Sequence, residues 1–166
     1  RGRVGNGRGT VSIAAVVLAA GEASRFGTPK QRLLLPYVLE RLEQSPVDDV
    51  VVVAGAHTLE TPARVVTCAG WKRGPGASLA SGLEELDDEV EAAIVVLADG
   101  PDLAPGAVER VIVSWRAEGG TLVAASYGGE RGHPLLVARE AWGTIPDAGL
   151  RELEVRLVSC DDLGDP

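Results

Sequence analysis

The sequence is poor in the residues on which several classes of protein depend. Its 166 residues include no methionine, two cysteines and few aromatic residues, namely three tryptophans, two tyrosines and one phenylalanine. Two cysteines are too few for a disulfide scaffold or a cysteine-based metal site. No apolar run approaches the roughly 18–20 residues that a membrane-spanning helix needs, and no signal-peptide pattern opens the chain. We therefore expect a soluble, cytoplasmic protein that does not bind membranes.

Basic residues are also scarce, because 16 Lys and Arg stand against 24 Asp and Glu and give a formal charge of −8. This balance argues against a general nucleic-acid binder, which would present a basic face. Residues 1–39 are the exception, since they hold one acidic residue, Glu22. The basic residues of the same stretch are Arg1, Arg3, Arg8, Arg25, Lys30 and Arg32. A locally positive segment in an acidic protein indicates an anionic ligand.

Length and composition predict one globular domain, since 45% of the residues are apolar and 24% are charged. Residues 1–10, rich in Gly and Arg, predict a flexible tail, and residues 11–166 a single domain. Residues 54–62 are a short connection for two parallel strands, which need a dozen or more residues between them. Either this connection is unusual, or the sequence lacks some loop residues.

Apolar runs and helical spacing alternate along the chain. Apolar segments, several of them continuous and rich in β-branched residues, predict strands at residues 12–18, 49–53, 63–67, 92–97, 122–125, 135–138 and 155–159. Helical spacing predicts helices at 31–44, 78–86 and 105–115, with Ser78 as an N-cap and a turn over residues 127–134. Strands that alternate with helices predict an α/β fold with a mainly parallel sheet.

The strongest motif is the loop that follows the first predicted strand, residues 18–30, which reads LAAGEASRFGTPK. A Gly-containing loop at the carboxyl end of a first strand is where α/β proteins bind phosphates. Arg25 and Lys30 would add positive charge there. The spacing excludes a P-loop, since Thr28 and Pro29 precede the lysine, and a dinucleotide fingerprint, since Gly21 lacks its partner glycines. The alternative is an ordinary loop with exposed basic side chains.

This loop resembles the signature of the MobA-like NTP transferase family, which reads roughly L-A-A/G-G-x-S-x-R-x-G-x-P-K. Further family segments follow in order at residues 33–36 (LLLP), 53–56 (VAGA), 77–83 (ASLASGL), 99–101 (DGP) and 132–134 (GHP). Within the family they look most like the molybdenum cofactor cytidylyltransferase branch. The resemblance implies a three-layer, Rossmann-like nucleotidyltransferase fold.

It also implies an activity, the transfer of a nucleoside monophosphate from an NTP to a phosphate acceptor with release of pyrophosphate. The acceptor would be molybdopterin or molybdenum cofactor, the cofactor Mg²⁺, and a molybdoenzyme a further candidate partner. Ala20 favours CTP over GTP, because the guanylyl branch more often has Gly at this position. Such chemistry needs chiefly positioning and charge neutralisation.

The resemblance assigns roles to residues of this chain. The nucleotide would contact Leu18, Ala19, Ala20, Gly21, Arg25, Lys30, Gly55 and Ser78. The catalytic residues would be Arg25 and Lys30, which hold phosphates, and Asp99, which ligates Mg²⁺. The acceptor would contact Gly132, His133 and Pro134.

Each of these roles has a structural alternative. In this alternative Asp99, which precedes Gly-Pro, shapes a turn and has no other role. Ser78 likewise serves just as a helix cap, and His133 just as a turn residue. Gly100 replaces the usual Gln of the family. The family's second acidic metal ligand lies in a C-terminal segment that we expect this sequence to lack. Two other functions stay open, a sugar-1-phosphate-type nucleotidyltransferase and a non-catalytic nucleotide-binding partner of a molybdoenzyme.

Overall fold

The structure is a computed structural model that describes residues 12–20, 30–55 and 59–164, with only the backbone of residues 30 and 31. The tail predicted at residues 1–10 lies outside the described residues. The strands are β1 (Ser12–Ala19), β2 (Asp49–Ala54), β3 (Arg64–Thr67), β4 (Val90–Leu97), β5 (Leu122–Tyr127), β6 (Glu130–Ala138) and β7 (Arg156–Ser159). The helices are α1 (Lys30–Glu43), α2 (Pro75–Glu84) and α3 (Pro105–Glu118), with 3₁₀ turns η1 (Trp71–Arg73) and η2 (Arg139–Thr144).

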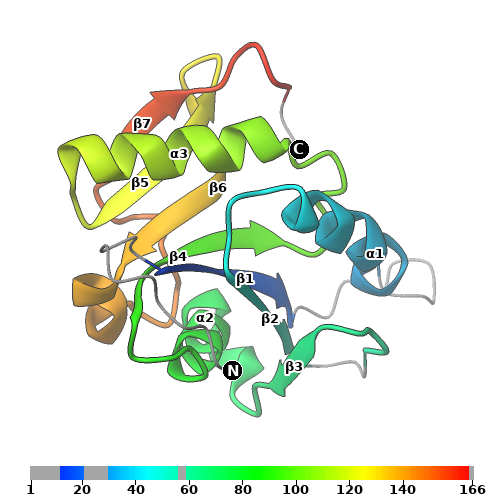
Figure 1. Cartoon of the computed structure of the whole chain (residues 1–166). Helices are drawn as coiled ribbons and strands as arrows, with labels where there is room; N and C mark the ends of the chain where they lie inside the picture. Colours follow the sequence, from blue (N-terminus) through cyan, green and yellow to red (C-terminus); the bar gives the residue numbers. More distant parts are fainter. Residues whose placement is uncertain (1–11, 21–29, 56–58, 165–166) are drawn as a thin grey trace.

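The strands of the described part of the chain form one sheet in the order β3-β2-β1-β4-β6-β5-β7 (Figure 1). Neighbours pair in parallel throughout β3-β2-β1-β4 and again at β5-β7, whereas β6 runs antiparallel to both β4 and β5. The predicted α/β fold with a mainly parallel sheet is therefore confirmed.

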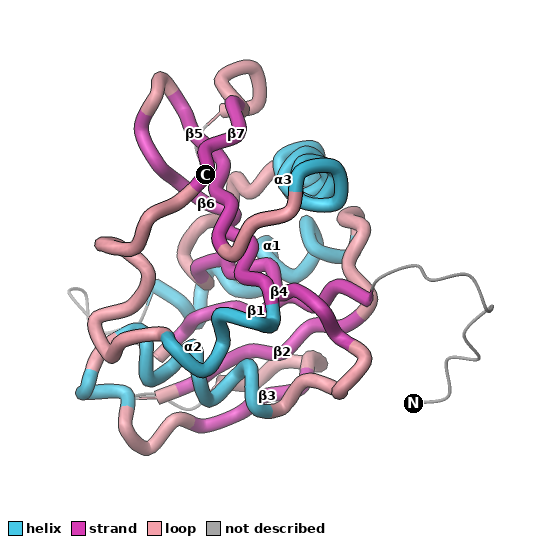
Figure 2. Tube along the Cα trace, turned by 90° about the vertical axis from the view of Figure 1, so that its left-hand side faces the viewer, coloured by secondary structure: helices cyan, strands magenta, loops and turns pink. Residues whose placement is uncertain are grey.

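Helices cover both faces of the sheet, which makes three layers. Seen along the sheet in Figure 2, α1 and α3 lie on one side and α2 on the other. Central strand β1 is buried on both faces, so that Ile13, Ala15 and Val17 pack with α1 and α3, while Ala14 and Val16 pack with α2. This two-sided burial explains why the strand is continuously apolar rather than alternating.

Two boundaries predicted from the sequence are wrong. Helix α2 begins at Pro75, after the N-cap Gly74, so Ser78 lies inside the helix and does not cap it. Residues 130–134, predicted as part of a turn, form the first half of β6. In both cases a tertiary partner, described below, extends the element beyond its local signal.

The short connection between β2 and β3 does join parallel strands. Val51 pairs with Arg64 and Ala54 with Thr67. Leu59 and Ala63 of the connection pack at the edge of the core that contains α1. The described part of the connection, residues 59–63, therefore lies on the α1 face of the sheet.

Candidate functional site

The ends of three parallel strands bring several of the predicted site residues to one end of the sheet. Leu18 pairs with Leu97 of β4, and Ala19 pairs with Ala54 of β2. The residues that follow these strands, Ala20, Gly55 and Asp99, therefore lie along one end of the sheet. We call this edge of the sheet, where β1, β2 and β4 end, the carboxyl end. Ligands of open α/β sheets bind at such an end.

At this end the backbone of Gly55 lies in close contact with its neighbours. A Cβ placed on Gly55 would lie 2.7 Å from the backbone oxygen of Ala20 and 2.7 Å from Cβ of Trp71. No side chain fits there, so only glycine lets β1, β2 and η1 approach so closely. Trp71 packs on the α2 face of the sheet, which agrees with a packing role for this tryptophan.

Leu18, Ala19 and Ala20 end the first strand and differ in what they can offer a ligand. The Ala19 side chain is 2% exposed and packs in the core on the α1 face. Ala20 is also buried, on the opposite face of the sheet. Any contact of these residues with a ligand would therefore use mainly backbone atoms.

Asp99 lies in the turn after β4, and its side chain is exposed. The amide of Ala98 donates to the Leu18 oxygen at 3.0 Å, and the amide of Gly100 donates to the Leu97 oxygen at 3.2 Å. The first bond ties the turn to the end of β1, and the second closes the turn itself. Asp99 lies in this turn, and its exposed carboxylate is accessible at the carboxyl end.

One exposed carboxylate fits a particular type of metal site. Mg²⁺ commonly binds through one or two carboxylates, with water and substrate phosphates as its other ligands. Among the residues that the structure describes, no three His, Cys, Asp or Glu side chains are grouped to hold a metal ion. The exposed Asp99 carboxylate suits a divalent cation whose other ligands are phosphate oxygens and water.

Ser78 lies in the second turn of α2 and is 3% exposed. The helix packs tightly on the sheet through Gly82, where a Cβ would lie 2.7 Å from both Val16 Cγ1 and Val53 Cγ2. This close approach holds α2 against β1 and β2. Close packing on the sheet therefore explains why Gly82, in the ASLASGL segment, is a glycine.

The start of α2 is fixed by a distant part of the chain, residues 146–149. The amide of Gly76 donates to the Asp147 backbone oxygen at 2.9 Å. A Cβ on Gly76 would lie 1.7 Å from the Pro146 oxygen. Arg73 and Asp147 form an exposed ion pair with 3.8 Å between Nε and Oδ2. The helix that carries Ser78 is therefore docked by backbone contacts.

The acceptor residues Gly132, His133 and Pro134 lie near the beginning of β6. Because β6 runs antiparallel to β4, its first residues lie at the same end of the sheet as Asp99. The structure thus places the predicted acceptor segment and the predicted nucleotide residues at one end of the sheet, on different strands.

Part of the predicted site lies outside the described residues. Gly21 and Arg25 belong to this part, and Lys30 is described only as the first backbone residue of α1. Their roles stay predictions.

Sequence reasoning missed two residues beside the acceptor segment. The Tyr127 hydroxyl donates to the His133 backbone oxygen at 2.7 Å. Arg131 donates to the backbone oxygens of Arg151 at 3.1 Å, Leu153 at 3.0 Å, and Leu150. Partial burial of this guanidinium lowers the pKa of Arg131. The available signal was that both residues lie in the predicted turn over residues 127–134, which contains the GHP segment.

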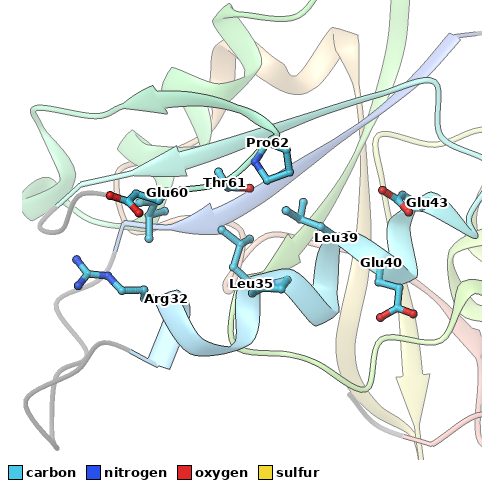
Figure 3. A pocket seen from close by; sticks show the side chains of 10 residues that line it. Arg32, Leu35, Leu39, Glu40, Glu43, Glu60, Thr61 and Pro62 are labelled. Carbon is cyan, nitrogen blue, oxygen red and sulfur yellow. The ribbon is translucent and has the colours of Figure 1, made fainter.

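A separate groove of about 190 Å³ lies between α1 and the connection that leads to β3 (Figure 3). Leu35 and Leu39 point into it from α1, opposite Pro62. Glu40 and Glu60 are also among the residues that line it. Among the predicted site residues whose side chains the structure describes, none lines this groove.

In the part of the chain that the structure describes, no helix has the length and apolar character to cross a membrane.

Comparison with known sequences identifies related proteins. A family model described as the MobA-like NTP transferase domain matches residues 15–159. A protein of Chloroflexus aggregans, described as a probable molybdenum cofactor guanylyltransferase, is 35% identical over 127 residues. The match covers 69% of this chain and 59% of that protein, so the chain spans about three fifths of the relative's length.

Solved structures share the fold. The crystal structure of a homologue of Mycobacterium tuberculosis Rv0371c, from Mycobacterium sp. strain JC1, is 28% identical with a TM-score of 0.75, over 90% of this chain and 86% of that chain. Rv0371c of M. tuberculosis H37Rv, in a complex with manganese, is 24% identical with a TM-score of 0.71, over 89% and 88% of the two chains. A nucleotidyl transferase of Methanothermobacter thermautotrophicus (Mth528) is 22% identical with a TM-score of 0.68, over 89% of this chain and 87% of that chain. The predicted nucleotidyltransferase fold is therefore confirmed.

Proposed function

We propose a function from the premise that the chain belongs to the MobA-like NTP transferase family. In this proposal the protein transfers a nucleoside monophosphate from an NTP to a phosphate acceptor of the molybdopterin type. An oxygen of the acceptor phosphate attacks the α-phosphorus of the NTP. The bond from this phosphorus to the oxygen that bridges to the β-phosphate breaks, and pyrophosphate leaves. The observation that carries the proposal is the convergence of Ala20, Gly55 and Asp99 at the carboxyl end, on three parallel strands.

We assign the residues of this chain to three tasks. The nucleotide lies against the backbone of residues 18–21 and Gly55, with Ser78 of α2 nearby. Arg25 and Lys30 hold its phosphates by charge. The start of β6, Gly132 to Pro134, receives the acceptor at the same end of the sheet.

Asp99 is the residue that would hold a divalent cation. A Mg²⁺ or Mn²⁺ ion bound there would neutralise charge on the transferring phosphates. Support comes from the exposed carboxylate at the end of β4 and from the manganese complex of the structural relative. The exposed position suits an ion whose other ligands are phosphate oxygens.

The identity of the base is where two lines of support differ. Ala20 favours CTP by resemblance, whereas the relative from Chloroflexus aggregans is described as a guanylyltransferase. The second comparison extends over 127 residues and the first rests on one position, so we propose GTP as the donor and keep CTP as the competing choice.

The test incubates the protein with Mg²⁺ or Mn²⁺, each of the four NTPs in turn, and molybdopterin or molybdenum cofactor, and measures pyrophosphate. Release with GTP supports the full proposal, and release with CTP alone overturns the base. Tight NTP binding without pyrophosphate from any mixture would instead favour a non-catalytic nucleotide-binding partner. Turnover with a sugar 1-phosphate, but with neither form of the cofactor, would overturn the acceptor.

Asp99→Asn tests the metal assignment. The variant keeps the shape of the side chain and removes the charge, so we expect kcat/KM to fall on the order of 100-fold, the effect of about 3 kcal/mol in the transition state. Asp88→Asn is the matched control, because Asp88 is exposed in the connection between α2 and β4. Equal activity of the two variants would remove Asp99 from the site.

A further inference from the structure

The acceptor segment begins β6 directly after the β5–β6 turn. Tyr127 ends β5 and pairs with Glu130, the first residue of β6. Gly128 and Gly129 form the turn with positive φ angles of 62° and 81°, a conformation that glycine adopts without strain. The tight turn folds β6 back along β5 and brings Tyr127 beside the first residues of β6.

The ring of Tyr127 lies against the backbone of Gly132. A Cβ on Gly132 would lie 2.8 Å from Cε2 and 2.9 Å from Cδ2 of the ring. Real Cβ atoms do not approach other atoms so closely. The missing side chain at position 132 is thus what allows the aromatic ring to reach this place.

The hydroxyl of the same side chain contacts the next residue. Its Oη donates to the backbone oxygen of His133 at 2.7 Å. Tyr127 also packs against the core on the α1 face, so the phenol is anchored at one side and bonded at the other. One side chain therefore fixes two consecutive peptide units, those of Gly132 and His133.

Other contacts hold the turn and the strand around this phenol. The amide of Gly128 donates to Asp161 Oδ1 at 2.7 Å. Arg131 binds backbone oxygens of residues 150–153. Because the β5–β6 turn is fastened on both sides, loss of the phenol bond should disturb residues 132–134 locally, without releasing the turn.

We propose that Tyr127 is a positioning residue for the acceptor, because it sets the backbone direction from which the His133 side chain leaves β6. The inference rests on the proposed function, in which residues 132–134 receive the acceptor. Tyr127 acts through Gly132 and His133 and does not touch the reacting phosphates. Its loss should therefore weaken the use of the acceptor and leave the use of the NTP unchanged.

Tyr127→Phe tests this separation, since it removes the Oη donor and keeps the ring. One hydrogen bond corresponds to about a five-fold effect, so we expect the KM for the acceptor to rise about five-fold, with the KM for the NTP within two-fold of wild type, roughly the noise of such assays. Tyr37→Phe is the matched control, because Tyr37 is 56% exposed on α1 and its variant should behave as wild type.

Gly132→Ala gives a second, independent reading. The added methyl group collides with the ring, so the KM for the acceptor should rise about ten-fold or more. The double variant Tyr127→Ala/Gly132→Ala should be no worse than Tyr127→Ala alone, because the methyl group then occupies space left by the ring. Circular dichroism melting of each variant shows that the kinetic effects belong to folded protein.

The outcomes separate the two proposals. If wild type releases no pyrophosphate with any donor and acceptor, the proposed function fails and the inference fails with it. If wild type is active and Tyr127→Phe has an unchanged KM for the acceptor, only the inference is overturned. Equal increases in the KM values of acceptor and NTP would also overturn it, since they would indicate a general structural role.

Discussion

Helices α2 and α3 begin with the same three residues, Pro-Gly-Ala, yet the glycine has a different environment in each. Gly76 of α2 is buried, and a Cβ there would lie 1.7 Å from the Pro146 oxygen. Gly106 of α3 is exposed, and a Cβ there would lie 3.5 Å from Leu163 Cδ1, an ordinary contact. The local sequence starts both helices with a proline in the first turn. What the glycine does is decided by the rest of the fold.

The two helices are also anchored by different means. The start of α2 is held by backbone contacts, since the Gly76 amide donates to the Asp147 oxygen. Helix α3 is held by arginine side chains. Arg110 forms a two-pronged bond with Asp162, at 2.7 and 3.1 Å. Arg156 of β7 binds the last turn of α3. A methyl group added at Gly76 would collide with the backbone that anchors α2. At α3, in contrast, the loss of one arginine contact leaves the other contacts in place.

The largest difference between the helices should appear in the pair Gly76→Ala and Gly106→Ala. At Gly76 the methyl group forces α2 away from residues 146–149, and we expect the free energy of unfolding to fall by about 3 kcal/mol. At Gly106 the methyl group makes only an ordinary contact with Leu163, and replacing glycine by alanine in a helix should stabilise by up to about 1 kcal/mol. Urea unfolding followed by circular dichroism measures both.

The same pair of variants also reads out the site. Because α2 carries Ser78, Gly76→Ala should weaken NTP binding as measured by calorimetry, whereas Gly106→Ala should not. Equal loss of stability in the two variants would contradict the contrast drawn between the helices. Unchanged NTP affinity in a folded Gly76→Ala variant would remove α2 from the nucleotide site.

This contrast explains what could be predicted of the helices from sequence. The start of α3 was predicted correctly because Pro105 is a strong local signal and nothing overrides it. The start of α2 was placed at Ser78, since serine is a preferred N-cap. The chain instead begins the helix at Pro75, against residues 146–149. A partner about 70 residues away leaves no local trace in the sequence.

The second prediction concerns the other end of α3. Arg156 donates to the Gly119 oxygen at 2.7 Å and to Glu118 Oε2 at 3.0 Å, and it also bonds Ser114. The bond to Gly119 satisfies a carbonyl group at the C-cap, where a helix end leaves such groups without partners. Arg156→Gln should lower the free energy of unfolding by about 1–2 kcal/mol, less than the loss expected for Gly76→Ala.

Arg41→Gln is the matched control for this variant. Arg41 lies in the last turn of α1 and is exposed, so its loss should change stability by less than about 0.5 kcal/mol. Both values come from the same urea titration. A loss at Arg156 no larger than that at Arg41 would show that the arginine contacts of α3 add nothing beyond an ordinary surface charge.

The candidate site was predictable to the extent that strand ends define it. Asp99 follows a buried strand, and parallel pairing carries it to the end of the sheet where Ala20 and Gly55 lie. Tyr127 and Arg131 were missed because their partners are backbone oxygens, which any residue provides. The GHP segment was predicted as a turn, since Gly and Pro are turn residues. In the structure it belongs to β6, between the residues of that strand that pair with Ser126 and with Ala124 of β5.

The smallest of the expected effects depends on pH and follows from the side-chain anchor of α3. The hydrogen bond from Arg110 is the main cause that lowers the pKa of Asp162 below its ordinary value. A carboxyl group whose pKa is lower in the folded protein stabilises it above the unfolded pKa, and the contribution disappears as the pH falls through the folded pKa. The advantage of wild type over Asp162→Asn should therefore shrink below about pH 4 and weaken with added salt. Asp88→Asn, at an exposed position, should show no such change.

The stability difference between wild type and Gly76→Ala should not shrink in this way at acid pH. The contact at Gly76 involves backbone atoms, which do not titrate. Urea titrations at a series of pH values between neutral and acid compare the two anchors directly. If the loss from Gly76→Ala also declined at acid pH, the exposed Arg73–Asp147 ion pair would have to carry part of the α2 anchor. The distinction between a backbone anchor and a charged one would then fail at this helix, while the steric contact at Gly76 would still account for the loss that remains.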